Sequence, residues 1–290
     1  ADPGTYIGSG KAEEIARFIK ADGDISLAVF DNELTPSQIR NLEDIFGVRV
    51  IDRTMLILDI FALHAVTGEG KLQVEIACLR YTAPRLTGKG TGLSRQGGTT
   101  GAIGARGPGE SKLEIDRRRM RERISALNEQ LKELDKTRGV KRERREKSGV
   151  PTVAIAGYTN AGKSTLLNYL TNAGILAENK LFATLDPTTR RLSLPGGSEV
   201  LLTDTVGFID RLPTHLVKAF KSTLDEISFS DIIINLVDAS ESAEERARKS
   251  AVTERLLDEL GASGKPVITV YNKSDAAVEP EFIPPSAVLI

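Results

Sequence analysis

A nine-residue stretch, Gly157 to Thr165, has the residue types and the spacing of a loop that binds phosphate. It reads Gly-Tyr-Thr-Asn-Ala-Gly-Lys-Ser-Thr, follows the apolar run 153–156 and precedes leucines at helical spacing. Its two glycines let backbone N–H groups curl around an anion, and the helix that follows adds the partial positive charge of its N-terminus. In such loops the lysine contacts the β- and γ-phosphates, and the serine hydroxyl binds Mg²⁺. The candidate nucleotide-binding residues of this loop are Asn160, Ala161, Gly162, Lys163, Ser164 and Thr165.

Two other polar segments offer partners for Mg²⁺ and the γ-phosphate. The first segment, 203–207, follows the apolar run 200–202, so Asp204 should lie at the end of a strand. There its carboxylate can hold Mg²⁺, and the N–H of Gly207 can contact the γ-phosphate. The second, Phe182 to Thr189, contains hydroxyls for the Mg²⁺ shell, with Thr184 as the first candidate and Thr188 as the second. The predicted metal ligands are Ser164, Thr184 and Asp204, and the predicted catalytic residues are Lys163, Thr184 and Gly207.

The segment Asn272-Lys273-Ser274-Asp275 follows the apolar run 267–270 and fits the recognition of guanine. The Asp275 carboxylate can accept two hydrogen bonds, from the guanine N1–H and from its exocyclic amine. Adenine lacks this pair of donors, so a site of this kind rejects ATP by leaving a buried carboxylate unpaired. Each short motif is weak evidence alone, but their order, with a strand before each, favours a guanine-nucleotide switch. The candidate nucleotide-binding residues outside the phosphate loop are Asp204, Gly207, Asn272, Lys273 and Asp275.

The composition is that of an ordinary soluble protein with two or three domains. The chain has 290 residues and a formal net charge of −1, and no run approaches the ~18 apolar residues of a membrane span. Its single cysteine, Cys78, cannot form an internal disulfide, which fits a reducing compartment. We therefore expect a cytoplasmic protein without a membrane span. Because the chain starts without Met and stops within the apolar run 287–290, we also expect both ends to be cut.

Residues 1–80 alternate between helical and strand-like patterns. The predicted helices cover 8–21, 35–46, 53–66 and the segment after Gly68, and the predicted strands cover 25–30 and 48–52. Thr35-Pro36 is the expected cap of the second helix. Strands separated by helices of this length predict a small α/β domain with a parallel sheet.

Residues 81–149 differ sharply in composition from the rest of the chain. From Arg85 to Gly109 there are nine glycines, four basic residues and no acid, so we expect a mobile loop. From Glu110 onward apolar residues repeat every seven positions with one break at Arg117, which predicts a coiled-coil helix. Gly139 is the expected turn to a return helix, so this segment is predicted to form an antiparallel helical hairpin.

Basic charge is concentrated in this middle segment. Residues 110–147 contain fourteen Lys or Arg against nine Asp or Glu, and residues 85–147 together carry +9 in a chain of −1. Such a concentration is typical of a polyanion-binding element, although a solvated helix with i,i+4 ion pairs would explain the helix charges equally well. Residues 82–147 lack aromatic side chains, which favours contact with phosphates and RNA shape over base stacking. The candidate RNA-binding residues are Arg95, Arg106, Arg117, Arg118 and Arg121.

Taken together, these motifs resemble those of the HflX family of ribosome-associated GTPases. In the C-terminal half the resemblance rests on Gly157 to Thr165, Phe182 to Thr189 and Asp204-Thr205-Val206-Gly207-Phe208. Upstream it includes Arg106-Gly107-Pro108-Gly109-Glu110, Leu113-Glu114-x-Asp116-Arg117-Arg118 and Thr5-Tyr6-Ile7-Gly8-x-Gly10-Lys11. It therefore spans nearly the whole chain.

The resemblance implies a fold, an activity and a partner. The expected fold is α/β: a P-loop GTPase domain with a doubly wound, mostly parallel sheet at 150–290, preceded by a small α/β domain at 1–80 and by a Gly-rich basic loop and helical coiled-coil hairpin at 81–149. The implied activity is the hydrolysis of GTP to GDP and phosphate with Mg²⁺. The implied partner is the large ribosomal subunit with its RNA, and the family role is the splitting or rescue of stalled ribosomes. We expect a monomer.

Three features of the sequence add to this expectation or depart from it. Phe208 stands where many GTPases have a glutamine that orients water, so slow intrinsic hydrolysis, completed by the ribosome, is expected. Asn160 resembles a residue of GTPases that use a monovalent cation, which would make K⁺ a second cofactor, but a side chain that braces the loop is an equally good interpretation. Ser286-Ala287 precedes the final apolar run, so the guanine-specificity segment that normally follows the last strand is expected to be cut off, which would weaken nucleotide binding.

Two other functions are also compatible with the sequence. One is an RNA-binding, ATP-dependent remodelling NTPase, which a competition between GTP and ATP and its loss in Asp275→Asn would distinguish. The other is a nucleotide-gated switch for protein interactions without an RNA partner, which ribosome binding that falls steeply with salt would disfavour.

Overall fold

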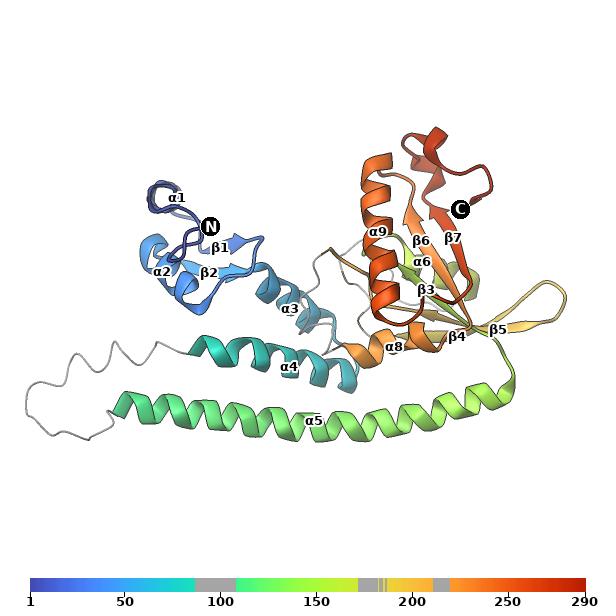
Figure 1. Cartoon of the computed structure of the whole chain (residues 1–290), viewed down its shortest axis with the longest axis horizontal. Coiled ribbons are helices and arrows are strands. Elements are labelled where there is room, and N and C mark those ends of the chain that lie inside the picture. Colours follow the sequence, from blue (N-terminus) through green and yellow to red (C-terminus); the bar gives the residue numbers. More distant parts are fainter. Residues whose placement is uncertain (87–107, 172–181, 183–184, 186, 211–219) are drawn as a thin grey trace, which may run out of the picture. The chain divides into compact units, whose positions relative to one another are not determined.

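The computed structural model describes residues 1–86, 108–171, 182, 185, 187–210 and 220–290. The chain forms two compact units, one of residues 1–59 and 74–130 and the other of residues 60–73 and 131–290 (Figure 1). The boundaries proposed from the sequence, at 80/81 and 149/150, remain a prediction.

The first unit contains a small α/β fold built on two parallel strands. β1 (Leu27–Phe30) pairs with β2 (Arg49–Asp52), and α1 (Ser9–Asp22) packs against α2 (Pro36–Phe46). The Thr35 hydroxyl accepts a hydrogen bond from the Gln38 N–H at 3.2 Å, and the Gln38 side chain accepts one from the Thr35 N–H at 2.9 Å, which closes a capping box. The core residues of this fold are Ala12, Ile19, Leu34, Leu42, Phe46 and Val50. The predicted parallel arrangement and the cap at Thr35 are confirmed.

β2 is followed by α3 (Arg53–His64) and α4 (Gly68–Thr82), and a buried carboxylate at the end of β2 contacts the start of α3. Asp52 is fully buried and accepts hydrogen bonds from the N–H of Leu34 at 3.1 Å and from the N–H of Met55 at 2.9 Å. Arg85, in the short helix η1 (Ala83–Leu86), reaches the same carboxylate at 3.5 Å. The charge is therefore paired and hydrogen-bonded, as a buried charge must be. Through this pair the start of the glycine-rich segment is attached to the first unit.

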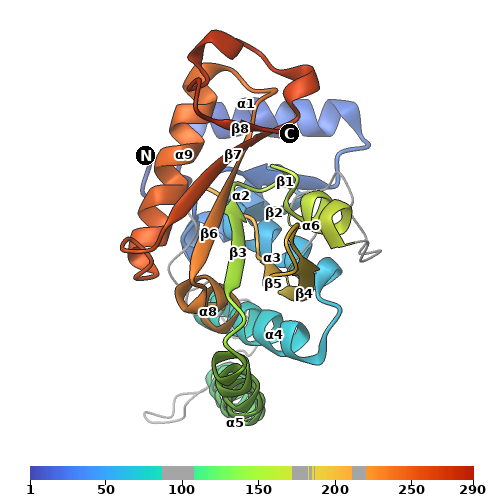
Figure 2. The ribbon, with the colours of Figure 1, turned by 90° about the vertical axis from the view of Figure 1, so that its right-hand side faces the viewer.

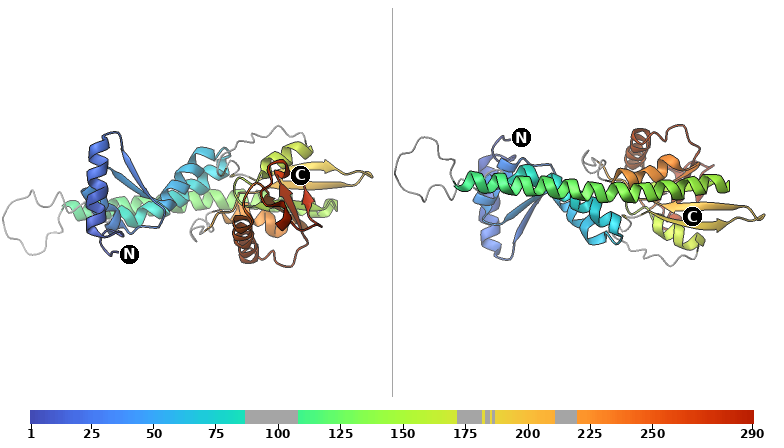
Figure 3. Two further views of the ribbon diagram at one scale, coloured as in Figure 1. Left: turned by 90° about the horizontal axis from the view of Figure 1, so that it is seen from above. Right: turned by 90° about the horizontal axis from the view of Figure 1, so that it is seen from below.

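The long helix α5 (Pro108–Ser148) runs through Gly139 without a break, so the predicted turn and return helix are wrong (Figure 3). Instead α4 is the second arm of the hairpin and lies along α5 (Figure 1). In the first unit Arg123 pairs with Glu75 at 2.7 Å, and in the second Arg138 pairs with Glu69 at 2.9 Å. A glycine inside a helix costs only about 1 kcal/mol relative to alanine, which the flanking helix-forming residues and a neighbouring ion pair outweigh.

Gly139→Ala is expected to raise the free energy of unfolding by about 1 kcal/mol, because glycine loses more backbone entropy in a helix than alanine does. A Cβ at this position would meet no other atom within 4 Å. Denaturant unfolding followed by circular dichroism measures the change. Gly47→Ala is the matched control, since its φ of +69° strains alanine and should lower stability. A loss of stability in Gly139→Ala would contradict the continuous helix.

The second unit is built on a six-stranded sheet in the order β4-β5-β3-β6-β7-β8. Its parallel strands are β3 (Thr152–Gly157), β5 (Glu199–Asp204), β6 (Ile232–Asp238), β7 (Val267–Asn272) and β8 (Val288–Leu289), and β4 (Thr188–Ser193) is the antiparallel edge. The predicted doubly wound, mostly parallel sheet is confirmed. Parallel strands end at one edge of a sheet, so the residues that close β3, β5, β6 and β7 come together there.

Helices cover both faces of this sheet (Figure 2). Along β3, Val153 and Ile155 pack toward α6 (Lys163–Thr171). Ala154 and Ala156 point to the opposite face, toward α8 (Lys221–Phe229) and α9 (Ala243–Glu259). A strand buried on both faces needs an uninterrupted apolar run, which is what the sequence shows before the phosphate loop. Among the helices in the described part of the chain, none is both long and apolar enough to cross a membrane.

Candidate nucleotide-binding site

The predicted phosphate loop joins β3 to α6, and its surroundings leave room only for glycine at two positions. Gly157 has a φ of +145°, and a Cβ there would lie 2.4 Å from the carbonyl oxygen of Leu236 in β6. Gly162 has a φ of +97°, and a Cβ there would lie 2.2 Å from Nδ2 of Asn272. The glycines are therefore required by close contacts with neighbouring segments, in addition to any requirement set by a phosphate.

Lys163 is the first residue of α6 and is buried against its own loop. Its ammonium group donates a hydrogen bond to the Tyr158 carbonyl oxygen at 2.9 Å. Burial lowers the pKa of Lys163 to about 8, although the negative charge of Asp204 acts in the opposite direction. An anion bound beside this buried ammonium would stabilise its protonated form, because a nearby negative charge offsets the cost of burial.

Ser164 and Asp204 meet beside this lysine and fit the predicted Mg²⁺ position. The Ser164 hydroxyl donates to Oδ2 of Asp204 at 2.6 Å, and Asp204, the last residue of β5, is fully buried. Hydroxyl and carboxylate oxygens are ligands that Mg²⁺ prefers, and here the two come from different segments of the chain to one point. Thr184, the third predicted ligand, lies outside the described residues.

The segment from Asp204 to Phe208 is attached to the phosphate loop by its backbone. The Thr159 N–H donates to the Phe208 carbonyl oxygen at 2.7 Å, and the Phe208 N–H donates to the Gly157 carbonyl oxygen at 3.1 Å. Gly207 approaches the loop so closely that a Cβ would lie 2.6 Å from Cα of Thr159 and 3.0 Å from Nζ of Lys163. Gly207 therefore lies beside Lys163, although its contact with a γ-phosphate stays a prediction.

The Phe208 side chain belongs to the hydrophobic core of the second unit. It packs with Leu224 and Ile227 of α8 and with Val252 and Leu256 of α9. The ring thus anchors the 204–208 segment to two helices. It supplies no hydrogen bond to a water molecule at the nucleotide site, which agrees with the chemistry of a phenyl ring.

The predicted guanine-recognition segment reaches back to the phosphate loop. Asn272, the last residue of β7, donates from Nδ2 to the Ala161 carbonyl oxygen at 2.8 Å. Lys273, with a φ of +61°, donates to the Asn160 carbonyl oxygen at 3.2 Å. Asp275 is exposed in the short helix η3 (Ser274–Ala276). The first two residues of the motif therefore connect the two loops, and an exposed carboxylate follows them.

Comparison with known proteins identifies the family. Three family models match in succession: a GTP-binding GTPase N-terminal region at residues 1–62, a GTP-binding GTPase middle region at 64–145 and a 50S ribosome-binding GTPase domain at 152–273. A GTPase HflX of Lacrimispora saccharolytica is 58% identical over 275 residues, which are 95% of this chain and 64% of that protein. A GTPase HflX of Spirochaeta thermophila is 42% identical over 279 residues, which are 96% of this chain and 67% of that protein. The chain belongs to the HflX family of GTPases.

This HflX-family chain spans just under two thirds of the length of several relatives, such as the 64% of the Lacrimispora protein. Among solved structures, it is similar to a GTP-binding protein from the hyperthermophilic archaeon Sulfolobus solfataricus in complex with GDP. That likeness has a TM-score of 0.46 and 29% identity, and it covers 94% of this chain and 71% of the other. The family inferred from the motifs is confirmed by the curated relatives.

The remaining predicted loop residues differ in exposure. Asn160 has a φ of +66° and is exposed, Ala161 is buried, and Thr165 is exposed on α6. The N–H of Ala161 donates to the Tyr158 carbonyl oxygen at 3.2 Å, which tightens the loop. Positive φ is uncommon outside glycine, but asparagine is one of the residues that tolerate it.

Three of the five candidate RNA-binding arginines can be placed in this HflX-family chain. Arg117, Arg118 and Arg121 are exposed on the part of α5 that belongs to the first unit. Arg118 lies 3.6 Å from Glu122 in an i,i+4 pair, and Nε of Arg121 donates to the Arg117 carbonyl oxygen at 3.3 Å. Arg95 and Arg106 lie outside the described residues. RNA binding by these arginines stays a prediction.

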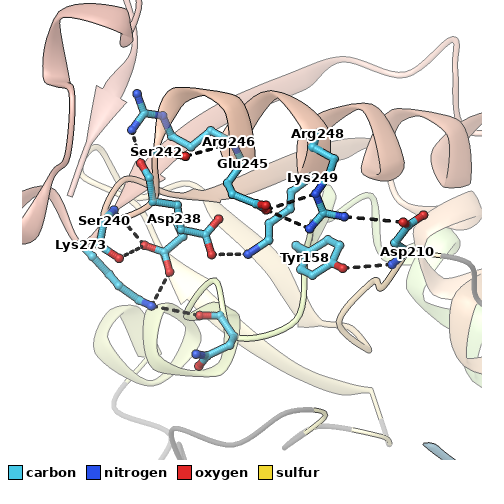
Figure 4. Close-up of polar contacts among 12 residues, drawn as sticks. Tyr158, Asp210, Asp238, Ser240, Ser242, Glu245, Arg246, Arg248, Lys249 and Lys273 are labelled. Carbon is cyan, nitrogen blue, oxygen red and sulfur yellow. Dashed lines mark hydrogen bonds and ion pairs between the residues drawn. The ribbon is translucent and has the colours of Figure 1, made fainter. Parts of the chain in front are cut away.

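Several residues that hold the site together have no role that was predicted from the sequence (Figure 4). The Tyr158 hydroxyl accepts a hydrogen bond from the Asp210 N–H at 3.1 Å, and the Asp210 carboxylate lies 3.6 Å from Arg248 and 3.8 Å from Arg255 of α9. No local signal could have paired positions so far apart. Asp238 is a further residue of this kind. For Asp238 the sequence did offer a usable signal, because it is an acidic residue at the end of β6, the strand next to β3.

Gly207→Ala is expected to abolish the preference for a GTP analogue over GDP while lowering GDP affinity by less than about threefold. The added Cβ would collide with the Thr159 backbone, so the 204–208 segment could not stay against the phosphate loop. Titration with fluorescent GDP and with a non-hydrolysable GTP analogue measures both affinities. Gly264→Ala is the control, because a Cβ there meets no atom within 4 Å. An unchanged analogue-to-GDP ratio in Gly207→Ala would contradict this role.

Proposed function

We propose that this HflX-family chain binds GTP and GDP with Mg²⁺, hydrolyses GTP, and associates with the large ribosomal subunit to split or rescue stalled ribosomes. The observation that carries the proposal is the direct linkage of three predicted motifs at one edge of the sheet. Ser164 bonds to Asp204, Gly207 lies against Thr159, and Asn272 bonds to the Ala161 carbonyl oxygen. The protein-family model that matches residues 152–273 is described as a 50S ribosome-binding GTPase, and this supports the proposed association with the large ribosomal subunit.

In the proposed reaction the chain supplies positive charge, metal ligands and orientation. Lys163 would contact the β- and γ-phosphates, while Ser164 and Asp204 would hold Mg²⁺, which when bound neutralises charge on the phosphate oxygens. The Gly207 N–H would bond only to a γ-phosphate, so the segment around it would differ between the GTP and GDP states. Asp275 would select guanine through its N1–H and exocyclic amine.

Hydrolysis by the chain alone should be slow. Most of the barrier in phosphoryl transfer is lowered by positioning and charge stabilisation, including a group that orients the attacking water. Phe208 is in the core and provides no such group. We therefore propose that the large subunit completes the catalytic arrangement. Rapid GTP turnover by this chain in the absence of ribosomes would contradict the proposal.

We include K⁺ as a second cofactor at Asn160. The residue is exposed in the phosphate loop with a positive φ, and its own carbonyl oxygen accepts a bond from Lys273. Comparing GTP turnover in potassium and sodium salts at equal ionic strength tests this. Equal rates would assign Asn160 a purely structural role in the loop.

Side-chain contacts connect the nucleotide site to α5 through α8, and they support the proposal that the bound nucleotide controls RNA binding by α5. Within the second unit, Glu226 of α8 pairs with Arg145 of α5 at 3.0 Å and lies 3.9 Å from Arg142. The Arg142 guanidinium also lies 3.4 Å above the centroid of the Phe229 ring. Because Phe208 packs on α8, a movement of the 204–208 segment would act on α5 through that helix.

Co-sedimentation of the chain with purified large subunits tests the proposal. We expect more chain in the pellet with a non-hydrolysable GTP analogue than with GDP, and binding that falls steeply with salt because phosphate contacts release counterions. A variant with Arg117, Arg118 and Arg121 changed to Ala should bind weakly. The matched control changes three exposed arginines elsewhere in the first unit, Arg17, Arg40 and Arg49, to Ala. Equal pelleting with both nucleotides, or none, would refute the proposal.

A further inference from the structure

Asp238 lies at a position in the sheet where it can join the two nucleotide loops. It is the last residue of β6, and β6 lies between β3, which leads into the phosphate loop, and β7, which leads into the Asn272–Asp275 loop. In the register of the sheet Asp238 is the direct partner of Asn272. None of the motifs predicted from the sequence includes Asp238, so we infer its role from its neighbours in the structure.

The Asp238 carboxylate is almost fully paired by its surroundings (Figure 4). One oxygen accepts a hydrogen bond from the Lys273 ammonium. The other accepts bonds from the N–H of Ser240, at 3.0 Å, and from the Ser240 hydroxyl. Burial alone would raise the pKa of Asp238, but the bonds from Lys273 and Ser240 outweigh it and lower the pKa below its ordinary value. The carboxylate is therefore a fixed negative charge in front of Lys273.

The turn after Asp238 is held rigidly, so the carboxylate is well anchored. The buried guanidinium of Arg246 donates to the carbonyl oxygens of Ala239 and Glu279, at 3.4 and 3.0 Å, and to that of Val278. A side chain that orients another group must itself be fixed by its surroundings, and this one is.

Lys273 needs such an anchor if it is to stay bonded to the phosphate loop. A lysine side chain is flexible and a single bond to a carbonyl oxygen does not fix it, whereas two partners on opposite sides do. Lys273 donates to Asp238 on one side and to the Asn160 carbonyl oxygen on the other, at 3.2 Å. The hydrogen bonds from Lys273 to Asp238 of β6 and to Asn160 thus connect the guanine-recognition loop to the phosphate loop.

We propose that Asp238 is a positioning residue for guanine-nucleotide binding, which acts by holding Lys273 against the phosphate loop. The inference rests on the proposed function, because it assumes that the site binds GDP. Loss of the carboxylate frees Lys273, lets the two loops separate more easily and so increases the rate at which a nucleotide escapes.

A double-mutant cycle on the 290-residue chain tests this, with ribose-labelled fluorescent GDP as the probe and stopped-flow measurement of both rates. Asp238→Asn is expected to raise the GDP dissociation rate about tenfold, with an unchanged association rate. In the Lys273→Met background the same substitution should change that rate by less than about twofold. Ser240→Ala, which keeps the charge but removes one bond to it, should raise the rate by about threefold and again only when Lys273 is present.

Asp231 provides a matched control, because it lies directly before the first residue of β6, at the end of the strand opposite to Asp238. It also accepts hydrogen bonds from a backbone N–H and a hydroxyl, both of Thr152, at 2.7 and 2.8 Å. Asp231→Asn should leave the GDP dissociation rate unchanged, even if it lowers the melting temperature.

The outcomes separate this inference from the proposed function. If the unaltered chain does not bind GDP, the proposed function is wrong. If it binds GDP, but Asp238→Asn leaves the dissociation rate unchanged or changes it equally with and without Lys273, the positioning role is refuted. If Asp238→Asn lowers only the fraction of chains that bind, its role is structural and the inference also fails. Should Asp238→Asn not fold, the two Ser240→Ala measurements decide in the same way.

Discussion

Lys163→Met is expected to weaken binding of GTP and GDP by about 30-fold to 4,000-fold, which corresponds to about 2–5 kcal/mol for one partner of a buried charge pair. The ammonium bonds to the Tyr158 carbonyl oxygen of the phosphate loop, and the negative charge of Asp204 acts on it, so its removal would leave phosphate oxygens without their strongest donor. Methionine has a similar length and suits a buried position, so the fold should persist. Equilibrium titration with fluorescent GDP gives the dissociation constant.

The control for this variant is Lys20→Met, which removes an exposed lysine from α1 in the other unit. It should bind GDP as the unaltered chain does. Circular dichroism of both variants checks that the fold is kept. Retention of full GDP affinity by a folded Lys163→Met variant would show that the loop does not bind phosphate in the expected way.

Asp275→Asn is expected to lower GTP affinity by about 100-fold and to remove the preference for GTP over ATP. The amide offers one acceptor and one donor where guanine needs two acceptors. Xanthine carries a carbonyl oxygen where guanine has its exocyclic amine, so the same substitution should improve the binding of xanthosine triphosphate. The exposed side chain of Asp275 means that the change should not disturb the fold.

Competition of GTP, ATP and xanthosine triphosphate against fluorescent GDP measures this specificity. Asp258→Asn, which alters an exposed acid in the last turn of α9, is the matched control and should keep the GTP preference. If ATP displaces fluorescent GDP from the unaltered chain as well as GTP does, the assignment of a guanine-recognition site is wrong. An ATP-dependent function then becomes the better explanation.

The motifs of the second unit were predictable because each is local. The phosphate loop, Asp204 and Asn272 each follow a short apolar run, and buried parallel strands must have such runs. Once the strands are parallel, their carboxyl ends meet at one edge, so the convergence of these residues follows from the topology. Other local signals identified the parallel β1–β2 pair, from two strands separated by a helix, and the cap at Thr35, from a threonine followed by proline.

The turn at Gly139 was the clearest error, and its cause is energetic. Glycine is a common end of helices, but inside one its penalty is about 1 kcal/mol. Here the ion pair of Arg138 with Glu69 lies next to it, and Arg142 and Arg145 contact Glu226 one and two turns later. These contacts involve residues far away in the sequence, so no local pattern around Gly139 could reveal them.

By itself, the sequence determined which residues could bind a phosphate, a metal and a guanine base, because that chemistry depends on residue type and spacing over a few positions. It also placed those residues at strand ends. Only the tertiary structure decided that Phe208 belongs to the core, that α4 and not a return helix lies along α5, and that Asp238 holds Lys273. The reason is physical: burial and pairing are set by neighbours brought together through the whole fold, and these have no fixed separation along the chain.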